Sequence, residues 1–320
     1  MSRRDETKSE KPPTAETKLK KSKLSNPGAL YAWPMGVWFA VFFVAPLAII
    51  VLYSFLKKGL YGGVEWVFSL KAYSQMLNPN YGILVIRTLK LSVLSTLFTI
   101  LIALPCGYAM ARSRHQTILL FLVIIPFWTN SLIRIFAWMS ILNNDGILNQ
   151  ILRSMGLAKD YIKFLYTGSA VVLVSVYMYI PYAILPIFTA VDRFDFSLLE
   201  AAQDLGANKL QAILKVLLPN IKSGISTGIV FTFIPIFGAY TVPLLVGGKD
   251  SYMIGNIIVD QVQKTRNWPL AAAFSMVLTL VSTAGVLWMM LAGKREAALT
   301  KNSAKEENYA ESSISTGALK

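Results

Sequence analysis

Long apolar runs separated by shorter polar segments dominate the hydropathy pattern of this chain. Six of the runs reach the roughly 20 helical residues needed to cross a hydrocarbon core about 30 Å thick. They are Pro34–Leu56, Ile83–Ala111, Thr117–Leu142, Ala170–Val191, Ile221–Val246 and Pro269–Leu291. Because a segment in lipid must pair its own N–H and C=O groups, and these runs lack the alternation of barrel strands, we expect helices. The pattern predicts an all-α, polytopic membrane protein with six transmembrane helices.

The amino-acid composition is that of a membrane protein. The chain of 320 residues is 54% hydrophobic and only 15% charged, against roughly 25% charged residues in soluble domains, and its mean hydropathy is +0.51. The runs form one predicted six-helix transmembrane domain over residues 29–293. The flanking segments, 1–28 and 294–320, are polar and rich in Lys, Glu and Ser, so we expect disordered tails.

Prolines fall inside several of the predicted helices. A proline removes one backbone hydrogen bond of the helix and kinks the helix. The residues concerned are Pro46, Pro105, Pro126, Pro181, Pro186 and Pro235. Kinked helices suit a protein that opens and closes.

Lys and Arg near the ends of the runs predict the orientation. On one side they crowd the amino tail and the segments after the second, fourth and sixth runs, including Arg3, Arg4, Arg112, Arg114, Arg193, Lys209, Lys215, Lys222, Lys294 and Arg295. The opposite loops carry a weaker supply over longer segments, so both termini and the loop around Glu200 should face the cytoplasm. Most of the net charge of +14 then comes from the Lys and Arg residues that set the orientation in the membrane. With no folded domain outside the membrane, nucleic-acid binding is excluded.

The loop between the fourth and fifth runs has a helical pattern of its own. Ser197 and Glu200 form a potential capping box at the start of a helix, and Gly206 would end it. A second helical segment, Asn208–Leu218, would have its apolar residues on one face: Leu210, Ile213, Leu214, Leu217 and Leu218. We therefore expect two short helices joined at a glycine bend. By pattern alone this segment could also be an amphipathic helix lying on the bilayer.

The residues of this loop resemble the EAA signature of permease subunits of ATP-binding-cassette importers. The matching terms are Glu200, Ala201, Ala202, Gly206, Leu218 and Pro219, with Val216 where the family usually has Ile. In that family the loop is the coupling helix that docks into the ATPase. The resemblance thus implies ATPase-coupling roles for these residues and for Asp204 between them.

No ATP site of its own is expected in this chain. A phosphate-binding loop has the pattern Gly-x-x-x-x-Gly-Lys-Ser/Thr. The segment most similar to it, Gly247-Gly248-Lys249-Asp250, has Pro243 in place of the first glycine and Asp250 in place of Ser or Thr. The lone Cys106 offers no metal cluster and no paired thiols. The chain is therefore expected to be no enzyme and to bind no cofactor, with ATP and Mg²⁺ held by a partner ATPase.

Further segments resemble the spermidine/putrescine importer permeases, most closely their B-type subunit. They are the run Pro126–Ile135, the triplet Ile254-Gly255-Asn256, and Asn267-Trp268-Pro269. The resemblance implies a heterodimer with a C-type permease, a dimer of ATP-binding subunits, an extracytoplasmic substrate-binding protein and a bacterial inner membrane.

A polyamine crossing the membrane needs carboxylates, carbonyls or aromatic faces. The predicted spans contain no Asp or Glu but are rich in aromatic residues, many of them near prolines. Candidates for the substrate path are Trp128, Asn130, Tyr177, Tyr179 and Tyr240, with Asp260 at the outer side. The same aromatic residues could instead form an interfacial belt.

Arg134 is an exception within the third run. A cation in a membrane span is costly unless it is paired or hydrated, and facing the path it would repel spermidine. We therefore expect a structural role, with Asn130, Asp145 or Asp160 as the partner.

Two other classes of function stay open at this point. A secondary transporter needs ionisable coupling residues at mid-membrane, where acids are absent. A membrane scaffold would need another partner for the loop around Glu200. Within importers, the alternative cargo is another small solute, such as an anion or an iron chelate.

Overall fold

The computed structural model describes residues 27–157, 159–287 and 290–291. The predicted tails, 1–28 and 294–320, lie outside the described residues except for the first two positions of the first helix. The chain divides into two compact units, residues 1–52 and 53–320.

The first predicted span is a helix with one irregular turn. Helix α2 (Pro27–Phe39) continues through a π-helical turn, Ala40–Val44, into α3 (Ala45–Ser54). Pro46 is the second residue after that turn, and a wider turn accommodates a residue that lacks the N–H of a regular helix. Residues Trp33–Ser54 are long and apolar enough to cross a membrane.

Apart from one hairpin, the described part of the second unit is helical. Strands β1 (Leu56–Lys58) and β2 (Val64–Phe68) pair antiparallel. The helices that follow are α4 (Lys71–Met76), α5 (Pro79–Ala111), α6 (Gln116–Ile124), α7 (Ser131–Leu142), α8 (Ile147–Ser154), α9 (Gly168–Asp192), α10 (Ser197–Asp204), α11 (Lys209–Ala212), α12 (Leu218–Asn220), α13 (Lys222–Phe237), α14 (Thr241–Val246) and α15 (Ile254–Gln263). A last helix, Trp268–Leu287, is a further candidate span.

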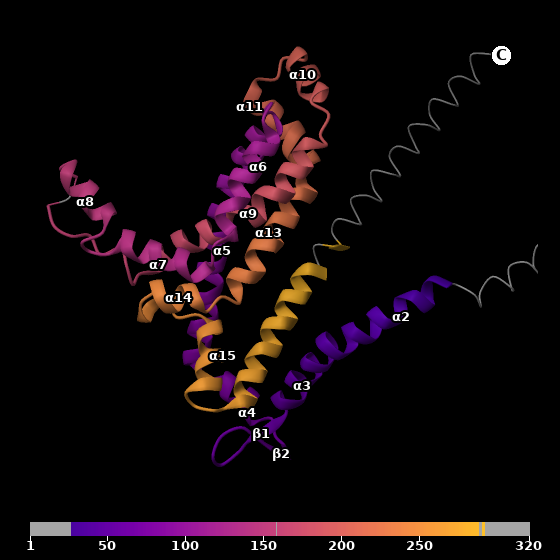
Figure 1. The fold of residues 1–320 in the computed structure, drawn as a ribbon, viewed down its shortest axis with the longest axis vertical. Coiled ribbons are helices and arrows are strands. Elements are labelled where there is room, and N and C mark those ends of the chain that lie inside the picture. The colour runs from indigo at the N-terminus through magenta and orange to yellow at the C-terminus, as the bar shows by residue number, and fades with distance from the viewer. Residues whose placement is uncertain (1–26, 158, 288–289, 292–320) are drawn as a thin grey trace, which may run out of the picture. The chain divides into compact units, whose positions relative to one another are not determined.

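Helices α5, α9 and α13 pack against one another and form the centre of this unit (Figure 1). The face of α5 toward this core carries small polar residues, all fully buried: Thr88, Ser92, Ser95 and Thr99. Gly224 of α13 lies so close to α9 that an added Cβ would be 2.4 Å from the Cβ of Ala190. Small residues at the contacts let membrane helices approach closely, where van der Waals packing holds them together.

The third predicted span is not one straight helix. Helix α6 passes into a 3₁₀ turn, Ile125–Trp128, and α7 then starts at Ser131 with the side chain of Asn130 as its N-cap. The two halves meet at 90°. Pro126 therefore lies where one helix stops instead of kinking a continuous rod, because Thr129 is extended and Asn130 begins a new helix.

The fifth predicted span also ends earlier than expected. Helix α13 stops at Phe237, and the residues up to Val246 form the separate helix α14. Within the described residues, four helices are long and apolar enough to span a membrane, and two bent helix pairs bring the number up to six. The bent pairs are α6 with α7 and α8, and the second half of the Glu200 loop with α13.

Candidate functional site

The loop around Glu200 forms a two-armed knob, residues 197–220, at one end of the α5–α9–α13 bundle (Figure 1). Leu199, Ala212 and Leu217 are buried and belong to a hydrophobic cluster. The same cluster includes Ala111 at the end of α5 and Val191 at the end of α9. The knob is thus packed against two long helices and should move with them as one body.

The first arm, α10, does not begin with the predicted capping box. Phe196 occupies the N-cap position without a side-chain hydrogen bond, and the carboxylate of Asp195 accepts instead from the N–H of Ser197 at 3.0 Å. Hydrogen bonds from Ser197 lower the pKa of Asp195. Glu200 is exposed in the first turn of α10, where its negative charge stabilises the helix by interacting with the positive end of the helix dipole. The capping box is absent because the helix already includes Ser197 and so starts one position earlier than a Ser197 N-cap requires.

Gly206 ends the first arm, as predicted. Its φ is +92°, in the left-handed region. The N–H of Gly206 donates to the carbonyl of Gln203, and that of Ala207 to the carbonyl of Ala202. These two bonds define a Schellman motif, which closes a helix and turns the chain. Asn208 then starts the second arm with a true capping box, paired with Gln211.

The buried face of the second arm differs from the predicted one. Helix α11 passes into a π-helical turn, Ile213–Leu217, before α12. The wider turn shifts the register, so Ala212 and Leu217 are buried whereas Leu210 and Leu214 are 65% and 52% exposed. Two leucines of the predicted apolar face are therefore available for another molecule.

The outward surface of the knob combines charge and apolar area. Glu200, Ala201, Asp204 and Gly206 are exposed, and Leu205 is 90% exposed. Among the other predicted coupling residues, Ala202 and Leu218 are half-buried against the chain's own core, and Pro219 is exposed. Exposed leucines beside charged residues are typical of a surface that a partner protein covers.

A hollow of about 440 Å³ separates the knob from the end of α5. Tyr108 and Arg112 line it from α5, and Glu200 and Lys209 line it from the two arms. The Arg112 guanidinium lies 5.0 Å from the centre of the Phe196 ring. Opposite charges thus face one space beneath the knob.

The predicted path residues are spread over several elements. Trp128 is 76% exposed, and the side chain of Asn130 caps α7. Tyr177 of α9 contacts the rings of Phe127 and Trp138, at centroid distances of 5.9 and 5.4 Å. These contacts gather aromatic faces at the bend between α6 and α7.

The other path candidates lie elsewhere. Tyr179 packs beside Tyr182 on α9, and Tyr240 is 45% exposed just before α14. Within the described residues, no ring contact or hydrogen bond joins two of the six candidates.

Asp260 on α15 is already engaged with its neighbours. Its carboxylate lies 2.8 Å from the Lys264 ammonium and accepts a hydrogen bond from the Tyr252 hydroxyl. Burial acts to raise the pKa of Asp260, but these hydrogen bonds outweigh it and lower the pKa. Burial and the carboxylate together raise the pKa of Tyr252 to about 12. A free carboxylate for an arriving cation would require this pair to open.

Residues 96–295 match the family described as the binding-protein-dependent transport system inner membrane component. The match contains the whole knob, all of α9 and the second half of α5. The chain belongs to this family.

Two curated proteins and one solved structure are similar to this permease over most of its length. The spermidine/putrescine transport system permease protein PotB of Escherichia coli (strain K12) is 36% identical over 246 residues, 76% of this chain and 90% of that protein. The inner membrane ABC transporter permease protein YdcU of the same organism is 32% identical over 276 residues, 79% and 86% of the two chains. A bacterial ABC transporter involved in the import of the acidic polysaccharide alginate has a similar fold, with a TM-score of 0.70, 20% identity, and coverage of 87% and 99%.

The permease is thus a multi-pass inner membrane component of an ABC importer, with the predicted all-helical polytopic fold. Subunits of this family are transmembrane parts without catalytic activity or a cofactor. Permeases of ABC importers associate with an ATPase and a periplasmic binding protein. Membership of this family excludes the two other classes of function, a secondary transporter and an unrelated membrane scaffold.

Arg134 of the permease has a different partner from those predicted. Its guanidinium lies 4.4 Å from the centre of the Phe127 ring, across the bend between α6 and α7. Among the described residues, its buried Nε and Nη1 atoms have no hydrogen-bond partner, and the Asn130 side chain accepts from the Leu132 N–H instead. The Arg134 cation therefore contacts an aromatic ring across the bend, through a cation–π interaction.

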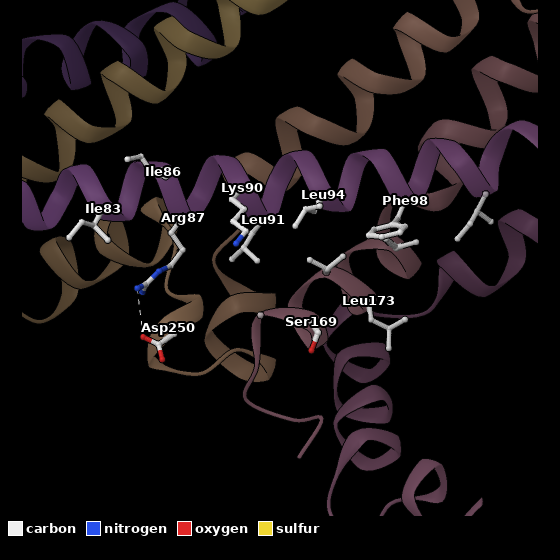
Figure 2. A pocket seen from close by; sticks show the side chains of 14 residues that line it. Ile83, Ile86, Arg87, Lys90, Leu91, Leu94, Phe98, Ser169, Leu173 and Asp250 are labelled. Atoms are coloured by element: carbon white, nitrogen blue, oxygen red, sulfur yellow. Dashed lines mark ion pairs between the residues drawn. The ribbon is translucent and has the colours of Figure 1, made fainter. Parts of the chain in front are cut away.

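A groove of about 820 Å³ runs between α5 and α9 of the permease (Figure 2). Arg87 and Lys90 extend into it from α5, and Asp250 lies near Arg87. These two cations were not among the residues predicted from the sequence, although their spacing of three positions inside an apolar run places them on one helical face. Two cations repel a polycation, so this groove does not suit a polyamine.

Proposed function

We propose that this permease is the B-type subunit of a polyamine importer and forms half of its transmembrane path for spermidine or putrescine. The observation that carries the proposal is the 36% identity with the spermidine/putrescine permease PotB, spread over most of both chains. The transmembrane half would lie within residues 29–293, beside a C-type permease.

Aromatic faces and carbonyls would carry the polyamine within the membrane. The rings of Trp138 and Tyr177 meet near the break in the third span, whereas Arg134 already lies over the Phe127 ring beside them. Cation–π contacts of about 0.5–2 kcal/mol each are weak enough to allow release. Trp128, Asn130, Tyr179 and Tyr240 are the further path residues in this proposal, and Asp260 would receive the cation at the outer side.

The knob would couple the permease to a dimer of ATP-binding subunits in the cytoplasm. Its exposed face offers Glu200, Ala201, Asp204 and Leu205, whereas its inner face is packed on α5 and α9. Displacement of such a body by closing ATPases would tilt the bundle and open the cavity to the other side. This is coupling through a two-state element.

Reconstitution of the four-part complex in liposomes tests the cargo. We expect spermidine and putrescine, each loaded on the binding protein, to stimulate ATP-dependent uptake, and unrelated solutes to have no effect. Equal stimulation by a solute other than a polyamine would contradict the substrate proposal and leave the importer class intact. Uptake that continues without ATP would contradict the coupling proposal.

A second candidate cargo is another small solute, an anion or an iron chelate. Arg87 and Lys90 in the large groove favour it, because they would attract an anion. The same liposomes loaded with an anionic solute separate the two candidates.

A further inference from the structure

The groove between α5 and α9 has apolar walls along most of its length. Ile86, Phe98 and Ile102 of α5 are 68%, 47% and 43% exposed, and Leu173 of α9 is 43% exposed. Its volume of about 820 Å³ lies within the range of ligand sites, roughly 300–1,000 Å³. Within the described residues, these side chains face open space that another apolar molecule could fill.

The groove is basic at one end only. Arg87 donates to the carbonyl of Lys249 at 3.1 Å and lies 3.7 Å from the Asp250 carboxylate. No hydrogen bond or ion pair of Lys90 is found in the described part of the chain. The amino end of the long helix α9, at Gly168 and Ser169, faces the same space (Figure 2).

The charges at this end favour an anion. Two cations and the positive end of a helix dipole face one carboxylate. The Asp250 side chain is fully exposed, so water screens its attraction for Arg87. A negatively charged group at Lys90 would gain from all three positive features.

We infer that the groove binds an anionic phospholipid, with its phosphate at Arg87 and Lys90 and an acyl chain along Leu94, Phe98 and Ile102. A lipid of this class supplies both parts that the groove needs, an anion and a long apolar chain. A solute anion would satisfy the basic end and leave the apolar walls exposed.

The position of the cations along α5 agrees with a lipid headgroup. Counting about 20 membrane-spanning residues back from Ala111 reaches Leu91, next to Lys90. From Lys90 to Ile102 the helix rises about 18 Å, close to the half-thickness of a core of about 30 Å. In the orientation proposed above, on which this step rests, the lipid belongs to the outer leaflet.

Lipid retention in the complete transporter complex tests the inference. The complex is placed in nanodiscs of phosphatidylcholine with a small fraction of phosphatidylglycerol, and bound lipid is counted by native mass spectrometry. We expect Lys90→Gln to lower phosphatidylglycerol retention about fivefold, and Arg87→Gln with Lys90→Gln to lower it about 30-fold, taking the usual effect of each basic residue. Arg87→Lys keeps the charge and should keep the lipid.

A matched control removes two cations outside the groove. The pair Lys58→Gln and Lys71→Gln lies near the hairpin end of the second unit and should leave retention unchanged. Equal retention of phosphatidylcholine and phosphatidylglycerol by the unaltered complex would overturn the inference, as would equal losses in the groove and control variants.

A photo-crosslinking residue at Phe98 identifies the occupant directly. Attachment to phospholipid supports the inference, and attachment to the second permease chain would overturn it by making the groove a subunit interface. Both measurements are independent of cargo. A complex that retains the lipid but ignores polyamines would refute the proposed substrate alone.

Discussion

Gly206 gives the knob its bend at the scale of a single residue. Its φ of +92° lies in a region that costs other residues about 1–2 kcal/mol. Nothing lies within 4 Å of a Cβ added at this position. The requirement for glycine therefore comes from the backbone alone, and the exposed position leaves room for a partner.

Gly206→Ala is expected to destabilise the knob by about 1–2 kcal/mol and to reduce the ATPase stimulation caused by loaded binding protein. Thermal unfolding and ATPase assays of the purified complex measure the two effects. Gly285→Ala is the control, because Gly285 lies in a regular helix with open space around it, where alanine is favoured. Identical behaviour of the two variants would contradict the argument.

Arg134 shows how a single side chain can stabilise a broken helix. The guanidinium lies over Phe127 at 4.4 Å, so a residue of α7 holds a residue from the end of the preceding turn. The Phe127 ring also contacts Tyr177. One aromatic ring thus links both halves of the third span to α9.

Phe127→Leu keeps apolar volume but removes the aromatic face. We expect a loss of about 0.5–2 kcal/mol of stability and slower uptake, read from thermal unfolding and liposome transport. Phe121→Leu serves as control, since Phe121 lies on α6 just before that turn and is 53% exposed. If the Phe121 variant loses as much stability as the Phe127 variant, the cation–π contact has no structural role.

At the scale of elements, irregular turns decide which faces pack. The π-helical turn Ile213–Leu217 rotates the second arm of the knob and exposes Leu210 and Leu214. The 3₁₀ turn Ile125–Trp128 ends α6 and lets α7 leave at 90°. In both places, one turn of non-α geometry redirects the chain without a long loop.

Asn208→Ala removes the capping box of the second arm. Loss of an N-cap costs about 0.5–2 kcal/mol, so the arm should fray, and ATPase stimulation by loaded binding protein should fall. Hydrogen exchange over residues 208–220 measures the fraying. Asn220→Ala removes an exposed amide that donates to the carbonyl of Val216, four residues earlier, and is expected to have the smaller effect. The opposite order would contradict the role of the cap.

At the scale of the whole molecule, the proposed topology predicts that the knob and the hairpin lie on opposite sides of the membrane. Leu205 on the knob and Leu60 between the strands are each 90% exposed. Their separation follows from the number of spans between them and from the excess of Lys and Arg near the knob.

A cysteine at each position tests this topology in a Cys106→Ser background, where no other thiol exists. In intact cells, a membrane-impermeant maleimide should reach Leu60→Cys when the outer barrier is open. It should reach Leu205→Cys only after the inner membrane is permeabilised. Labelling of both from the same side would contradict the proposed orientation.

Local structure could be predicted from the sequence where a residue type at a given position usually adopts one conformation. The bend at Gly206 was predictable because a glycine after a helix usually adopts a positive φ. The cap of the helix that begins at Ser197 was not predictable, because Asp195 and Ser197 are both good capping residues and only the folded backbone selects between them. The partner of Arg134 was missed since the sequence pointed to carboxylates, whereas the fold offers a ring.

By itself the sequence determined the class of this protein: apolar runs must become helices in lipid, and the motif around Glu200 resembles the importer permeases. The tertiary structure decided the break at Pro126, the early end of α13 at Phe237, the exposed leucines of the knob and the basic groove at Arg87 and Lys90. The physical reason is that hydropathy is a sum over a segment. Caps, irregular turns and grooves depend instead on which atoms meet after packing.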